Sequence, residues 1–288
     1  MTTSDDIALM LLALAVMAAW LGSGWMVVAV VRRLRAGLPI VAAEPQRPVP
    51  WRGIDVIAAV VIMILARIVA QVAINAINTT TRGDASEITS QPDMTLQLVA
   101  GVLAMLGGAA VTAMMLLRNG ASWADLGLWP LAPARDLRLA VGGLALVLAP
   151  LLAVAALLNR IVPYQHPIID YLNQQSDPLA IAVVVVAAIV VAPIAEEFLF
   201  RRVLQGWLET LPLPLGPATA IGLASLAFAA AHAGHGLAWL PLLALGIVLG
   251  VLVRQTGSIV PAILLHALFN AVSVGLLLLQ LSGLVPAN

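Results

Sequence analysis

Apolar segments of about 20 residues recur along the chain, separated by short polar connections. A segment of this length and composition crosses the hydrocarbon core of a bilayer as an α-helix, because lipid offers no partners for an open backbone. By this criterion we place spans at residues 7–31, 54–77, 96–117, 139–158, 179–200, 218–232, 237–253 and 259–281. The sequence therefore predicts an all-α protein, a polytopic transmembrane helix bundle with about eight spans.

The composition agrees with a membrane protein and excludes several other classes. Hydrophobic residues make up 62% of the 288, charged residues only 10%, and the formal net charge is zero. No basic surface indicates nucleic acid, so the expected partners are membrane lipids and a membrane-associated substrate. The absence of cysteine excludes disulfides, thiolate nucleophiles and cysteine-ligated metals. The oligomeric state does not follow from the composition.

The arginines predict the orientation of the spans. Only Arg82 and Arg160 fall at connections on one face, whereas the other connections carry Arg32, Arg33, Arg35, Arg47, Arg52, Arg118, Arg135, Arg138, Arg201, Arg202 and Arg254. The positive-inside rule makes the arginine-rich face cytoplasmic. We expect a multi-pass protein of the cell membrane with its N- and C-termini outside the cytoplasm. The first apolar segment lacks a basic region before it, so we interpret it as a retained span rather than a signal peptide.

Four charges follow the fifth apolar segment in the stretch EEFLFRR. The nine Leu, Ile and Val residues between positions 179 and 192 favour insertion by roughly 3 to 5 kcal/mol, and one charge at mid-membrane costs about 2.5 to 3.5 kcal/mol. Glu196 and Glu197 must therefore face water, lie near the membrane edge or pair with other side chains inside the bundle. Glu197 and Arg201 have the spacing of a helical ion pair. Glu196 has no such partner on its own helix.

Two later segments carry polar pairs in apolar surroundings. Phe228 and His232 are four residues apart, and so are His266 and Asn270, so each pair shares one helical face. The charges of the first stretch alone are compatible with an ordinary helix end, and a single intramembrane histidine or asparagine is often a hydrogen bond between helices. Two histidines, an amide and an unpaired carboxylate on three helices instead indicate a functional site near the cytoplasmic side.

Such a set of side chains has the groups needed for amide hydrolysis. A glutamate beside a neutral imidazole can hold and deprotonate water, and a second imidazole with a carboxamide can stabilise the oxyanion. The sequence contains neither the G-x-S-x-G elbow of serine hydrolases nor the H-E-x-x-H zinc motif. Glu196, His232 and His266 nevertheless form a plausible zinc ligand set. We expect no cofactor, with zinc as the alternative.

Three motifs occur in a fixed order. They are E-E-x-x-x-R at Glu196 to Arg201, F-x-x-x-H at Phe228 to His232, and H-x-x-x-N at His266 to Asn270. This arrangement resembles the CPBP family of intramembrane proteases, also called the ABI family, which includes type II CAAX prenyl endopeptidases and bacteriocin-processing or immunity proteins. The resemblance covers about residues 178 to 275. We therefore divide the chain into N-terminal helices, 1–177, and a CPBP-like catalytic core, 178–281.

The resemblance implies a role for each motif residue. Glu196 corresponds to the catalytic glutamate that activates water, with His232 as its partner, and His266 with Asn270 to the pair that stabilises the oxyanion. Glu197 and Arg201 correspond to a supporting ion pair, and Arg201 is also a candidate for holding a substrate carboxylate. Phe228 is interpreted as packing. The implied mechanism is glutamate-dependent, with a zinc metalloprotease as the alternative.

The leading hypothesis is thus an intramembrane endopeptidase that cleaves a membrane-associated peptide or protein. A non-enzymatic immunity or interaction protein of the same family is the first alternative. A proton-coupled transporter is less favoured, because the chain shows neither matching halves nor paired broken helices. A prenylated CAAX peptide is the substrate of eukaryotic relatives, whereas this cysteine-free, lysine-free and alanine-rich chain is typical of bacteria. The remaining polar residues are weaker candidates for the site. We place His235 and His166 in connecting loops, and we expect Arg67 to line a cavity or to bond another helix.

Overall fold

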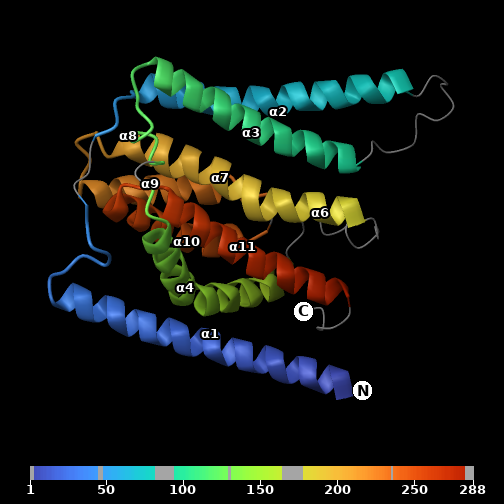
Figure 1. Ribbon diagram of the computed structural model, residues 1–288, viewed down its shortest axis with the longest axis vertical. Helices are drawn as coiled ribbons and strands as arrows, with labels where there is room; N and C mark the ends of the chain where they lie inside the picture. The colour runs from blue at the N-terminus through green and yellow to red at the C-terminus, as the bar shows by residue number, and fades with distance from the viewer. Residues whose placement is uncertain are drawn as a thin grey trace.

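The computed structural model describes residues 3–44, 48–81, 94–128, 131–163, 178–234 and 236–282, and all regular structure within these ranges is helical. Most helices run side by side along one direction, as Figure 1 shows. The predicted all-α bundle is confirmed. His235, His166, Arg47 and Arg82 lie outside the described residues.

Four long helices form the N-terminal part: α1 (Thr3–Arg35), α2 (Gly53–Thr81), α3 (Met94–Arg118) and α4 (Pro133–Ile161). Helix α2 packs along α3, and α4 packs against both α1 and the last helix of the chain. Small residues permit these close approaches: a Cβ at Gly108 would lie 2.7 Å from the Met63 sulfur. The hydroxyl of Ser23 donates to the Ala145 carbonyl at 2.7 Å and joins α1 to α4.

The C-terminal part begins with one continuous helix, Pro178–Leu208, in which the helix type changes repeatedly. Its segments are α6 (Pro178–Val186), η2 (Ala187–Val191), α7 (Ala192–Glu196), η3 (Glu197–Gln205) and α8 (Gly206–Leu208), and both η segments are π-helical. Three further helices follow: α9 (Pro217–Ala230), α10 (Trp239–Thr256) and α11 (Val260–Leu281). Helices α9 and α10 pack against each other, and α11 packs against α4 and η2.

Seven helices in the described ranges are long and apolar enough to cross a membrane, so the chain is a multi-pass membrane protein. The prediction of about eight spans is close, and the difference lies at residues 218–232. That segment forms α9, which has 14 residues and is therefore about 21 Å long. A bilayer core is about 30 Å thick. Helix α9 is thus a short apolar helix packed on α10.

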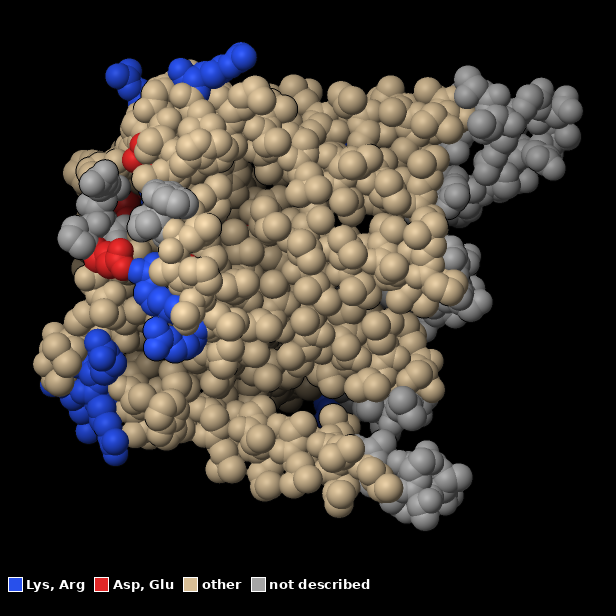
Figure 2. Space-filling view, viewed as in Figure 1, with Lys and Arg blue, Asp and Glu red and all other residues tan. Residues whose placement is uncertain are grey.

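Most of the charged side chains visible in Figure 2 lie at one end of the bundle, and most of its flank is apolar. This is the end where α1 ends and α2 begins, whereas α1 starts at the opposite end (Figure 1). Three arginines occupy the last turn of α1, namely Arg32, Arg33 and Arg35. The prediction was wrong in one respect: Arg201 and Arg202 do not lie in a connection but inside η3, where they are 0% and 7% exposed.

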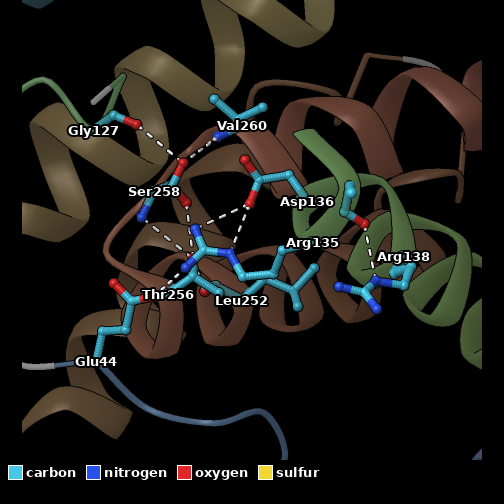
Figure 3. Close-up of polar contacts among 10 residues, drawn as sticks. Glu44, Gly127, Arg135, Asp136, Arg138, Leu252, Thr256, Ser258 and Val260 are labelled. Atoms are coloured by element: carbon cyan, nitrogen blue, oxygen red, sulfur yellow. Dashed lines mark hydrogen bonds and ion pairs between the residues drawn. The ribbon is translucent and has the colours of Figure 1, made fainter. Parts of the chain in front are cut away.

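A polar cluster at the charged end joins segments that are distant in the sequence (Figure 3). Arg135 donates to the buried Asp136 at 3.1 Å and forms an ion pair with Glu44. Between α10 and α11, the Ser258 hydroxyl donates to the Gly127 carbonyl at 3.3 Å. These contacts fix the start of α4 and the turn before α11.

Candidate active site

Glu196 and Glu197 lie where α7 changes into the π-helical segment η3. Pro193, three residues before Glu196, lacks the backbone N–H that an α-helix requires and its ring displaces the carbonyl of the preceding turn. At such an interruption a helix kinks or forms a π-bulge. The local sequence thus explains why the helix is irregular here, and π-bulges occur frequently at functional sites.

Glu197 is completely buried and uses both carboxylate oxygens. Its Oε2 accepts a hydrogen bond from Arg201 Nε at 3.1 Å, which confirms the predicted ion pair. Its Oε1 lies 2.9 Å from His266 Nδ1 on α11. Because a carboxylate only accepts, Nδ1 of this histidine donates to Glu197, and Nε2 is the nitrogen on the side of Glu196. Glu197 therefore orients His266 as well as neutralising Arg201.

Glu196 lies on the other side of the same imidazole. Its Oε2 is 3.9 Å from His266 Nε2, and its side chain is 21% exposed. That separation is too long for a direct hydrogen bond. One water molecule about 2.8 Å from each atom would bridge them. His266 therefore stands between two glutamates, one bonded to it directly and one at the distance of a shared water.

Phe228 forms the apolar centre of the site. It is completely buried, and its ring lies 4.9 Å from the His232 ring and 5.7 Å from the His266 ring, centroid to centroid. The Arg201 guanidinium carbon lies 4.8 Å above the same ring, within the range of a cation–π contact. The interpretation of Phe228 as a packing residue agrees with this geometry: it holds three polar side chains in fixed relative positions.

His232 lies just after α9 and is half-buried. Its Nδ1 is 2.8 Å from the carbonyl of Phe228, so Nδ1 carries the proton and Nε2 is the nitrogen left for other contacts. In the part of the chain that the structure describes, no hydrogen bond joins His232 directly to Glu196. The structure thus brings His266 closer to Glu196 than His232.

Asn270 lies four residues after His266 on α11 and contacts a different part of the long helix. Its side-chain nitrogen donates to the Ala188 carbonyl in η2 at 2.8 Å. The predicted site residues therefore divide into two sets. Glu196, Glu197, Arg201, Phe228, His232 and His266 form one connected cluster, and Asn270 binds the helix upstream of it.

Behind the cluster lies a polar interior that the sequence analysis missed. Arg201 Nη1 and Nη2, Gln205 Oε1 and Ser225 Oγ are buried without hydrogen-bond partners among the described residues. A Cβ at Gly246 would lie 3.2 Å from Arg201 Nη2 and 3.3 Å from Ser225 Oγ. Gly246 and Gly250, four residues apart on one face of α10, are the sequence signal that could have indicated this interior.

Zinc ligation requires three protein donors around one point. Within the described ranges, no group of three His, Asp or Glu side chains is arranged to hold a metal ion. Glu196 and His266 approach each other, but His232 does not complete the set predicted as an alternative. The three donors predicted as the zinc alternative are therefore not assembled around one point among the described residues, and the absence of a cofactor stays a prediction.

Comparison with known protein families gives a match to the C-terminal part of the chain. Residues 178–272 match the family model of the type II CAAX prenyl endopeptidase Rce1-like proteins. The match includes all three motifs and confirms the family resemblance that they indicate. Comparisons with curated proteins and with solved structures gave no match.

Proposed function

We propose that this membrane protein, whose residues 178–272 are Rce1-like, is an endopeptidase that hydrolyses a peptide bond of a membrane-associated peptide or protein. The single observation that carries the proposal is the 3.9 Å gap between Glu196 Oε2 and His266 Nε2. This gap has the width for one water molecule held by two proton acceptors. A water held in this way is oriented for deprotonation and attack.

In the proposed reaction Glu196, as a carboxylate, takes a proton while the water oxygen bonds to the carbonyl carbon of the peptide. The carbonyl π electrons move to oxygen and form a tetrahedral oxyanion. When the oxyanion collapses, the carbon–nitrogen bond breaks and Glu196 returns the proton to the leaving amine. The products are a carboxylic acid and an amine, and no covalent enzyme intermediate forms.

The neighbouring residues support Glu196 in different ways. His266 accepts the second hydrogen of the water at Nε2, because Glu197 holds the proton on Nδ1. Arg201 pairs with Glu197 inside the bundle and holds its carboxylate in place. His232 presents Nε2 from the end of α9 and is proposed to hold the other side of the substrate or water. Oxyanion stabilisation by His266 and Asn270, which the family resemblance implies, would require a proton on His266 Nε2 in place of the lone pair used here, and it stays a prediction.

The location of the site suggests the substrate class. Glu196 lies 12 residues before the end of the long helix at Leu208, and that end carries most of the visible charged side chains (Figure 2). By the positive-inside rule this end is cytoplasmic. We propose that the substrate is a lipid-anchored or membrane-embedded peptide cleaved near the cytoplasmic surface of the cell membrane, with both termini of the protease outside.

The decisive experiment compares Glu196→Gln with the wild-type protein. The substitution keeps the size of the side chain and removes its ability to take a proton. We expect the variant to insert and fold normally and to lose cleavage by at least about 10²-fold, measured as accumulation of uncut substrates in the membrane peptidome. A matched control is Glu44→Gln, which alters a carboxylate at the charged end away from the site. Unchanged peptides in the Glu196→Gln strain would refute the proposal and favour a non-enzymatic binding role.

A further inference from the structure

The long helix has a carbonyl group that its own backbone cannot satisfy. In an α-helix the N–H of residue 192 binds the carbonyl of residue 188. Here the N–H of Ala192 binds the carbonyl of Ala187 instead, as a π turn requires. In the same π pattern the next donor for Ala188 would come from position 193, which is proline and has no N–H. Ala188 is therefore without a donor in either pattern.

Asn270 supplies the missing donor from another helix. Its side-chain nitrogen lies 2.8 Å from the Ala188 oxygen, and it is half-buried. A carbonyl freed by proline inside a membrane helix costs free energy unless a neighbouring side chain or water binds it. The contact therefore replaces one backbone hydrogen bond of the helix that carries Glu196.

We propose that Asn270 is a positioning residue that acts through Ala188. Its amide stabilises the π-helical form of η2, and η2 sets the rotation of the residues that follow it, including Glu196. Helix α11 then holds the long helix at two points, because His266 binds Glu197 and Asn270 binds Ala188. Two points fix the rotation of one helix on the other, whereas one point leaves it free. The catalytic part of this inference rests on the proposed function; the hydrogen-bonding part does not.

The motif spacing gains a physical reason from this arrangement. His266 and Asn270 share one face of α11, and that face meets the long helix on both sides of Pro193. The histidine contact lies after the proline and the asparagine contact lies before it. The pair therefore bridges the one place in this helix where the backbone ladder is broken.

The test is a double-mutant cycle between Asn270 and Pro193, read by thermal unfolding of the full-length protein in detergent at one fixed scan rate. Asn270→Ala leaves the Ala188 carbonyl unpaired, and we expect Tm to fall by about 2–6 °C. Pro193→Ala restores an N–H that can reach this carbonyl. In the Pro193→Ala background we expect the decrease to shrink to less than half.

The matched control is Pro217→Ala, in the first turn of α9, where no helix donor is missing. It should leave the effect of Asn270→Ala unchanged. If Asn270→Ala yields no folded protein, recovery of folded protein in the Pro193→Ala background is the expected result. An equal decrease in both backgrounds, or no folded protein in either, would overturn the inference.

Cleavage in the same four proteins separates positioning from direct action on the substrate. We expect Asn270→Ala to reduce cleavage of the Glu196-dependent peptides by at least about 10-fold, and Pro193→Ala to restore most of that loss. A double variant that regains Tm but not cleavage would overturn the positioning role and assign Asn270 to the substrate. If the wild-type protein itself cleaves nothing, the proposed function fails, while the Tm cycle still decides whether Asn270 acts through Ala188.

Discussion

His266 Nδ1 lies 2.9 Å from Glu197 Oε1, and the same carboxylate binds Arg201 through its other oxygen. The three side chains are 3% exposed or less. The buried Glu197 carboxylate thus binds one residue of α11 and one residue of its own helix. Its charge is balanced inside the bundle, and its geometry fixes which nitrogen of the histidine faces Glu196.

Glu197→Gln should damage both stability and cleavage. The substitution leaves Arg201 as a buried cation without its carboxylate, which typically costs about 3–5 kcal/mol, and removes the acceptor that fixes the tautomer of His266. We expect a clear fall in Tm and a loss of cleavage on the order of 10²-fold. The control is Arg254→Gln, whose partly exposed pair with Glu209 spans 3.5 Å and should contribute less than about 1 kcal/mol. Equal losses of Tm and of cleavage in the two variants would contradict the role assigned to Glu197.

Gly250→Ala should destabilise the packing between α10 and the long helix. The added Cβ would lie 2.7 Å from Gln205 Oε1 and 2.9 Å from the Ile221 side chain. Because Gln205 is buried and also donates to the Gly250 carbonyl at 3.0 Å, neither neighbour can move freely. We expect a loss of about 1–3 kcal/mol, measured by unfolding in detergent. Gly222→Ala on α9, where nothing lies within 4 Å, should be neutral or slightly stabilising.

Glu209 should give the protein a pH-dependent stability at the charged end. It lies just after the long helix, and burial raises the pKa of its carboxyl above the ordinary value, against the lowering effects of Gln205 and Arg254. The folded state then holds this proton more tightly than the unfolded state does. The contribution of Glu209 to stability should therefore increase as the pH falls through the raised pKa toward about 4.3. Glu209→Gln should remove this dependence of the unfolding free energy on pH. An unchanged dependence in the variant would contradict the prediction.

Cleavage should not depend on zinc. The donors around His266 do not form a three-ligand metal site within the described ranges, and we propose that Glu196 activates water directly. Purified protein treated with a zinc chelator and then dialysed should retain its cleavage rate, with metal content measured by elemental analysis. Stoichiometric zinc whose removal abolishes cleavage and whose return restores it would reverse this prediction.

The sequence predicted those features that depend on local spacing. The helices followed from runs of apolar residues, and the ion pair of Glu197 with Arg201 followed from their separation of four residues. The gathering of three helices around Phe228 was expected because isolated polar groups in lipid need one another. These inferences rest on periodicity and on the cost of burying charge, and both are properties of short segments.

Features that depend on contacts between distant residues were not predictable in this way. The π segments around Pro193 are stabilised partly by Asn270, which lies 77 residues later in the sequence. The closer approach of His266 than of His232 to Glu196 depends on where α11 lies. The burial of Arg201 was not predicted, because it depends on which helices enclose η3.

The shortness of α9 has a consequence for the surrounding bilayer. Its exposed Leu223 and Leu226 face outward from a helix about 9 Å shorter than a bilayer core, whereas neighbouring helices are long enough to cross it. The apolar band of the protein is therefore shorter beside α9 than elsewhere around its circumference. Lipids beside α9 must thin or tilt to match it. Acyl-chain length should consequently affect the region next to His232 more than any other part of the molecule.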